Sequence, residues 1–219
     1  MIRAIFLFIS VCLFLANPAI AEIGEILETG GQVQIRTAKA KKIVGEPGVV
    51  IDAMDMVKVR KKSIAHFKMI DNSKFQIASS TTVVFDEFVF DEKRQRLTAR
   101  ILDGVLAFDG KKLTTDSKRK FVSGGYTLTV RGTKFAGSFG NTNKVYLLKG
   151  SINVSGRGSS VDLVGPMKSI EFDQSGIGVV ERVEIDEIKT WFVEVGLDFK
   201  RLVGPDFEEK LKSGAIAVD

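Results

Sequence analysis

The single histidine is the first residue to consider for chemistry, because histidine serves as a general base beside a nucleophile. A Ser-His-Asp triad on His66 would need an exposed serine, and no G-x-S-x-G nucleophile elbow occurs in the sequence. A metal site with several histidine ligands is excluded, since His66 is the only histidine. Alternating apolar and polar types in residues 63–70 predict a strand with His66 on its polar, exposed face. We therefore predict that the protein is not an enzyme.

An acidic cluster in residues 86–92 is the candidate for a cation site, because Ca²⁺ prefers carboxylate and carbonyl oxygens. Its acidic members are Asp86, Glu87, Asp91 and Glu92. The cluster lacks the Asp-x-Asp-x-Asp-Gly spacing of a dedicated calcium loop, and Lys93, Arg94 and Arg96 follow it. A charged hairpin rim is therefore favoured, and we expect neither a metal ion nor a cofactor.

The Arg-Gly-Thr step at residues 131–133 is the site to examine first for binding. A glycine between two strand-like runs, such as Gly132, suits a bulge or a close approach of two backbones. Arg131 would then pair with a carboxylate, and Thr133 would bond backbone groups that the bulge leaves open. The alternative is an anion-binding Arg131 in a groove. We favour the structural role and keep Arg131 as the candidate partner surface.

The only cysteine, Cys12, lies in an apolar run of residues 4–16 that follows Arg3. This pattern is typical of an export signal, with small residues up to Ala21 where a signal peptidase would cleave. The run is shorter than the roughly 20 residues that span a bilayer, although a retained anchor is the alternative. Cleavage after Ala21 would leave no disulfide and no thiol in the mature chain. It would also make the protein periplasmic or secreted, where we expect no nucleic-acid partner.

Three basic segments, residues 39–42, 60–62 and 117–120, are predicted to be loops. The formal net charge is +5, which favours anionic partners such as lipid head groups or acidic glycans. Charged loops are usually just solvated, so we expect membrane association to be peripheral at most.

The elements that must position these residues are short strands. Turn signals recur from about residue 30 to 180, and the runs between them are rich in β-branched and aromatic types. Two of these turns are predicted at Asp103-Gly104 and at Lys149-Gly150. Alternation such as that of residues 126–131 is typical of half-buried strands. The sequence predicts an all-β fold, an irregular β-solenoid-like or sandwich stack of short strands.

The pattern changes after residue 180, where apolar residues recur at helical spacing. They are Ile185, Ile188, Phe192, Val195, Phe199 and Leu202. This spacing predicts one helix that ends at Gly204-Pro205, followed by a shorter piece over residues 206–212. We favour a lid packed on an open end of the β-structure, and the alternative is a docking helix for a partner.

The order of motifs over residues 31–172 resembles the FecR domain, the iron-dicitrate-sensor type. Residues 67–77 are similar to the family's hairpin, and residues 102–108 to a later strand. The most specific match is the step at residues 128–135, followed at the expected distance by residues 145–154. The signature residues, which we expect to be structural, are Arg131, Gly132, Thr133, Phe135 and Gly150. Asp71-Asn72 departs from the family's Asp-Gly, a change that asparagine tolerates because it adopts positive φ.

The resemblance implies the fold and the compartment. Regulatory members of the family carry a cytoplasmic segment and a membrane helix before this domain. We identify neither segment in this sequence, so we expect no sigma-factor module in this chain. The predicted organisation is a signal peptide over residues 1–21, a FecR-like β domain over 22–180 and a helical segment over 181–219.

The sequence thus predicts a non-enzymatic exported FecR-domain protein that acts as a periplasmic interaction or sensing module. Its partner would be an envelope protein or a cell-wall component. The alternative is a structural envelope protein, tethered to anionic lipid or peptidoglycan through its basic loops.

Overall fold

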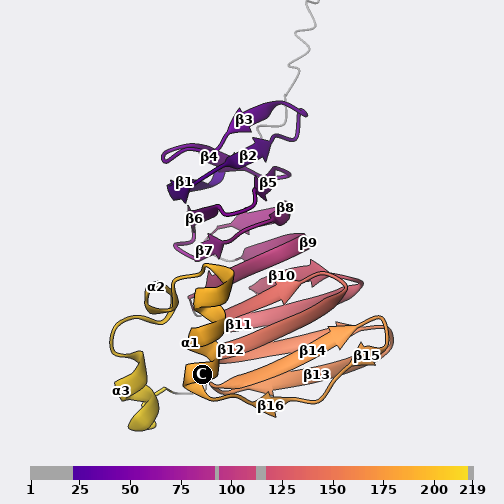
Figure 1. Ribbon diagram of the computed structural model, residues 1–219. Helices are drawn as coiled ribbons and strands as arrows, with labels where there is room; N and C mark the ends of the chain where they lie inside the picture. Colours follow the sequence, from indigo (N-terminus) through magenta and orange to yellow (C-terminus); the bar gives the residue numbers. More distant parts are fainter. Residues whose placement is uncertain (1–21, 92–93, 112–116, 217–219) are drawn as a thin grey trace, which may run out of the picture.

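The computed structural model describes residues 22–91, 94–111 and 117–216 (Figure 1). The predicted signal peptide and its cleavage point after Ala21 lie outside the described residues. Within the described part of the chain, no helix is long and apolar enough to cross a membrane.

The protein is an open stack of strands in two layers that enclose a hydrophobic core. The first half of layer A is, in order across the stack, β4 (Val50–Asp52), β1 (Glu22–Gly30), β6 (Ile64–Met69) and β7 (Lys74–Ile77). The layer continues with the end of β9 (Gln95–Asp109), the end of β11 (Tyr126–Phe139), the start of β12 (Thr142–Gly156) and β14 (Lys168–Asp173). The short strands β15 (Gly176–Ile177) and β16 (Glu181–Arg182) both pair with β14. The order in layer B is β3 (Lys42–Val44), β2 (Val33–Arg36), β5 (Met56–Val59), β8 (Thr81–Phe90), the start of β9, β10 (Lys118–Ser123), the start of β11, the end of β12 and β13 (Ser159–Val164). The predicted all-β stack of strands, solenoid-like or sandwich, is confirmed.

Three long strands run through both layers, which corrects the expectation of short strands alone. In β9, residues 95–103 pair with β8, whereas residues 104–109 pair with β7 and β11. The strand turns a corner at Asp103-Gly104, and β12 turns a similar corner at Lys149-Gly150. Both steps were predicted to be turns between strands. They lie inside continuous strands because the backbone keeps its ladder hydrogen bonds on both sides of the bend.

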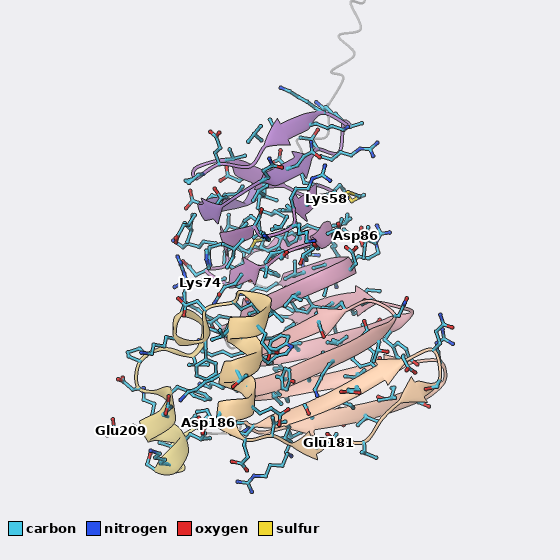
Figure 2. The ribbon with its side chains drawn as sticks, viewed as in Figure 1. Lys58, Lys74, Asp86, Glu181, Asp186 and Glu209 are labelled. Atoms are coloured by element: carbon cyan, nitrogen blue, oxygen red, sulfur yellow. The ribbon has the colours of Figure 1, made fainter. Side chains whose placement is uncertain are left out.

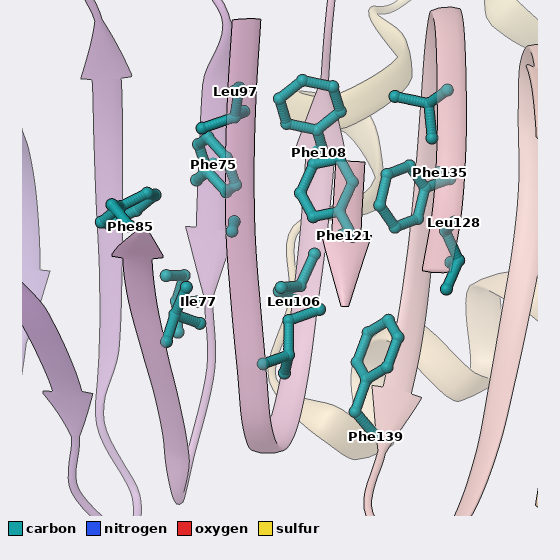
Figure 3. Close-up of a cluster of buried hydrophobic side chains, with 14 of the residues drawn as sticks. Phe75, Ile77, Phe85, Leu97, Leu106, Phe108, Phe121, Leu128, Phe135 and Phe139 are labelled. Carbon is teal, nitrogen blue, oxygen red and sulfur yellow. The ribbon is translucent and has the colours of Figure 1, made fainter. Parts of the chain in front are cut away.

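Phenylalanine rings fill the space between the layers (Figure 3). Phe75, Phe108 and Phe135 come from layer A, and Phe85 and Phe121 come from layer B. The rings of Phe108 and Phe121 lie 4.9 Å apart between centroids, as do those of Phe121 and Phe135. Edge-to-face and tilted contacts of this kind stabilise a core beyond the area that they bury.

The C-terminal helices are α1 (Ile185–Val195), α2 (Phe199–Val203) and α3 (Phe207–Lys212). They lie against the outer face of layer A, with Ile188 and Phe192 of α1 buried (Figure 1). We predicted that the helical segment forms a lid on an open end of the β-structure. This prediction was wrong, because the helices cover the outer face of layer A. Small outward residues such as Ala107 and Ala136, neighbours on β9 and β11, let the helix approach this face closely.

The predicted single helix is broken into α1 and α2. Gly196 adopts a left-handed conformation with φ of 75° and ends α1, a common way for a helix to stop. The side chain of Asp198 then accepts a hydrogen bond from the backbone of Arg201 and begins α2. Phe199 and Leu202 stay on the buried side, so the apolar spacing predicted the contact face correctly and the helix end wrongly.

Polar contacts hold the helical segment to the sheet. The Gln76 amide donates to the carbonyl of Asp198 and accepts from its N–H, both at 2.9 Å. Lys134 Nζ donates to the carbonyl of Leu202 at 2.7 Å. These bonds satisfy backbone groups at the covered face, where an unpaired group would be costly.

Replacing Phe192 with alanine tests how firmly the helices are packed. Phe192 has no exposed surface, so Phe192→Ala should lower the free energy of unfolding by about 3–5 kcal/mol. The neighbouring Val193 is 80% exposed, so Val193→Ala should change the free energy of unfolding by no more than about 0.5 kcal/mol. Urea unfolding measures both variants. Equal effects would contradict the packing described for α1.

Candidate partner-binding face

The Arg-Gly-Thr step forms the corner at which β11 crosses from layer B to layer A. Gly132 has a φ of 58°, and the register between β11 and β12 shifts between Arg131 and Lys134. The Thr133 hydroxyl accepts from the Arg131 N–H at 2.9 Å and donates to the Ser151 carbonyl at 2.8 Å. The buried hydroxyl thus bonds the backbone groups that the bulge displaces from the ladder.

The corner of β12 stacks directly on that of β11. Gly150 has a φ of 85°, and a Cβ atom added there would lie 2.6 Å from the carbonyl oxygen of Gly132. Both the conformation and the close approach therefore require glycine. Phe135, just beyond the corner, is buried in the aromatic core.

Arg131 differs from the other signature residues because its side chain is exposed on the outer face of layer B. No ion pair among the described residues includes Arg131. The expected pairing of Arg131 with a carboxylate is thus not found in the described part of the protein.

Neighbouring strands place further cations beside Arg131. Lys118 of β10 is paired in register with Arg96 of β9, and the next pair along β10 and β11 is Arg119 with Val130. One step back along this register, Lys118 lies beside Arg131. We call Arg96, Lys118 and Arg131 the cationic row. Strands lie about 4.8 Å apart, so the row spans roughly 10 Å across the sheet.

A groove of about 200 Å³ lies beside two members of this row, Arg96 and Lys118, and Arg131 is outside its lining. It is lined by Glu87, Arg96, Leu97, Thr98, Lys118 and Lys120. Glu87 accepts a hydrogen bond from Thr98 at 3.2 Å and lies 4.0 Å from Arg96, so it offsets part of the positive charge. Lys118 and Lys120 form no ion pair among the described residues, and the groove keeps a net positive charge.

The basic segment at residues 117–120 was predicted to be a loop, and this prediction was wrong. Residues 118–120 begin β10, with Lys118 and Lys120 exposed and Arg119 buried. Arg119 Nη2 donates to Asp71 Oδ2 at 2.8 Å, and Nη1 donates to the Lys111 carbonyl at 2.6 Å. The sequence analysis missed the ion pair between Arg119 and Asp71. The alternation of buried and exposed positions in β10 could have indicated that Arg119 is buried, because it places Arg119 on the same face as Phe121.

The acidic cluster is used in surface ion pairs at the β8–β9 hairpin. Asp86 pairs with Arg100 through bonds of 2.7 and 3.0 Å, and Asp91 pairs with Arg94. Asp86 and Lys58 lie on the side of the stack opposite to Lys74 and the helices (Figure 2). Glu92 and Lys93 lie outside the described residues, within which no group of acidic, histidine or cysteine side chains is arranged to hold a metal ion.

His66 is buried, which corrects the expectation of an exposed histidine. It lies on the outer face of layer A, paired with Gln76, and the turn before α2 covers it. Its Nδ1 finds no hydrogen-bond partner among the described residues. The adjoining cavity of about 20 Å³ is lined by Leu27, His66, Phe67, Lys74, Phe75, Gln76, Asp109, Arg201 and Leu202. This lining contains no serine, so a triad on His66 is not assembled there.

The stacked corners can be tested with a pair of glycine variants. Gly150→Ala should lower the free energy of unfolding by about 3 kcal/mol, because strain at positive φ and a backbone clash add together. Gly158 has a similar φ of 80° but nothing within 4 Å of an added Cβ, so Gly158→Ala should cost about 1 kcal/mol. Urea unfolding distinguishes the two. A smaller loss for Gly150→Ala than for Gly158→Ala would refute the corner packing.

Burial of His66 should make stability depend on pH. Burial lowers the pKa of His66 and the positive charge of Arg201 lowers it further, while Glu28 and Asp198 act in the opposite direction. The unfolded chain therefore binds a proton first as the pH falls below about 6.5. The free energy of unfolding should therefore fall as the pH is lowered through about 6.5, the ordinary pKa of histidine.

The matched variant is His66→Gln, which does not titrate in this range and should show a flatter pH dependence of the urea midpoint. Identical curves for both proteins would contradict the burial of His66 as a neutral imidazole.

Comparisons with known proteins agree with this architecture. Residues 55–154 match the sequence model of the family described as FecR protein. Two crystal structures of a protein described as an anti-sigma factor, from Parabacteroides distasonis, are similar in fold, each with a TM-score of 0.52 and 13% sequence identity. The similar region covers 63% of this chain and 63% and 64% of those chains.

The likeness at this identity shows the fold, and this chain spans less than two thirds of the solved chains it matches. A search of curated proteins found no match. The matched residues 55–154 include the hairpin at Asp71, the corner at Gly132 and the corner at Gly150. Residues 55–154 of the chain therefore contain a FecR domain.

Proposed function

We propose that the protein is a non-enzymatic interaction and sensing module of the cell envelope, exported to the periplasm by its N-terminal signal. Its partner binds the outer face of layer B around Arg131. The partner is an envelope protein or a cell-wall component.

The unequal coverage of the two layers supports this proposal. The chain's own helices bury the outer face of layer A against residues such as Ala136 and Tyr146. No helix of the described residues packs on the outer face of layer B, where Arg131 and Lys118 are exposed. A charged face that the molecule does not use internally is available to a partner.

The relatives support the sensing part of the proposal. The similar structures are described as an anti-sigma factor, a class of protein that regulates by binding a partner. The chemistry of the described residues agrees with a binding role, since His66 is buried beside a cavity too small for a substrate. A cavity of about 20 Å³ holds no more than a water molecule.

A second candidate function is a structural envelope protein tethered through its basic loops. The exposed lysines Lys39, Lys41 and Lys42, at one end of layer B, favour this alternative. Such contacts are screened by salt, so tethering would weaken steeply as the ionic strength rises.

Affinity capture from envelope extracts tests the proposal. The wild-type protein, an Arg131→Glu variant and a Lys39→Glu variant are immobilised, and bound proteins and glycans are identified in low and high salt. We expect one discrete component to be retained by the wild type and by Lys39→Glu, and to fall at least about tenfold with Arg131→Glu.

Retention that is lost equally in Lys39→Glu and Arg131→Glu would favour tethering by general charge. Retention that is unaffected by Arg131→Glu would place the partner elsewhere and sink the proposed face. Thermal unfolding of each variant checks that both exposed substitutions leave the fold intact.

A further inference from the structure

We infer that the partner of the cationic row is an anionic polysaccharide, whose acidic groups bind along Arg96, Lys118 and Arg131. This inference rests on the proposed function and names the chemical class of its ligand. The first observation is charge. Lys118 and Arg131 have no counter-ion among the described residues, and only Glu87 lies near Arg96.

The spacing of the cationic row fits a chain of repeated charges. Its side chains come from three adjacent strands, so the positive groups follow one another at roughly the strand spacing of about 4.8 Å. Lys120 lies on the next row of β10 and adds a fourth cation beside the groove. A linear polyanion lying across the strands would contact these groups in succession, whereas a single small anion would use only one or two of them.

The rest of the face carries hydroxyl and amide groups suited to sugars. Lys120 is paired with both Thr98 and Thr129, and Thr129 is paired with Asn153. Ser151 lies beside Arg131 on β12. These groups point outward, because the residues between them, such as Val130 and Ile152, are buried. Sugar hydroxyls would find hydroxyl groups beside Lys120 and Arg131, whereas the Asn153 amide already donates to Ser160 and Asp162.

The composition of the face argues against two other partners, a protein and a lipid bilayer. Protein interfaces are enriched in aromatic residues and depleted of lysine at their core, and β10 exposes two lysines and no aromatic ring. Surface binding to a bilayer uses inserted apolar side chains. The large exposed apolar side chains around this face lie at its margins: Phe90 at the β8–β9 hairpin, Leu102 beside the corner of β9, and Val164 on the edge strand β13.

Binding to defined polymers tests the inference. The purified protein is titrated with polygalacturonate, which carries carboxylates, with heparin, which carries sulfates, and with neutral dextran. Vesicles of phosphatidylcholine with phosphatidylglycerol serve as the lipid probe. We expect binding to at least one anionic polymer and none to dextran. The double variant Lys118→Gln with Arg131→Gln should weaken that binding about tenfold.

The matched control is Lys39→Gln with Lys42→Gln, which removes the same charge from the loop and β3 at the end of layer B. It should leave the affinity within about twofold of the wild type. Equal weakening by both double variants would overturn the inference, because it would show attraction to net charge alone. Binding to the vesicles but to no polymer would overturn it in favour of a lipid surface.

The failure of this inference is distinguishable from the failure of the proposed function. If no polymer binds while the envelope capture still yields a protein that depends on Arg131, the face binds a protein and only the inference is wrong. If neither polymer nor extract yields a component that depends on Arg131, both are wrong.

Discussion

The close contact between two backbone corners is the constraint on which the rest of the structure depends. β11 and β12 each pass from one layer to the other, and they can do so side by side only if their corners stack. At Gly150 an added Cβ would lie 2.6 Å from the Gly132 carbonyl, so the corners approach as closely as two backbones can. Thr133 bonds the backbone groups that the bend displaces. The aromatic core is enclosed because these strands contribute side chains to both layers.

The corner also explains why one signature residue is exposed while its neighbours are buried. Gly132 and Thr133 are buried, because the bulge needs a residue that adopts positive φ and a hydroxyl that bonds the displaced backbone groups. Arg131 precedes the bend and follows the alternation of layer B, which points it outward. The motif therefore combines a structural requirement with a surface cation, and both arise from one change of strand direction.

The helices give the molecule two unlike faces. Small residues on the outer face of layer A allow α1 to pack closely, and Gln76 and Lys134 bind the backbone around α2. The outer face of layer B carries charged and hydroxyl side chains such as Arg96, Lys118 and Thr129. The binding face is thus the one that the chain's own helices leave exposed.

The sequence by itself determined the all-β class, the turn chemistry and the apolar side of the C-terminal segment, because these follow from local periodicity and from residue types. Asn72, for example, adopts a φ of 62°, as expected for asparagine in that turn. Only the tertiary structure decided that Gly104 and Gly150 are corners inside strands, since a turn signal does not reveal whether the ladder continues beyond it. The burial of His66 and Arg119 was equally undetermined. The burial of His66 depends on the turn before α2, and that of Arg119 depends on its pairing with Asp71. Both partners are distant in sequence, and periodicity cannot show which distant segment covers a strand.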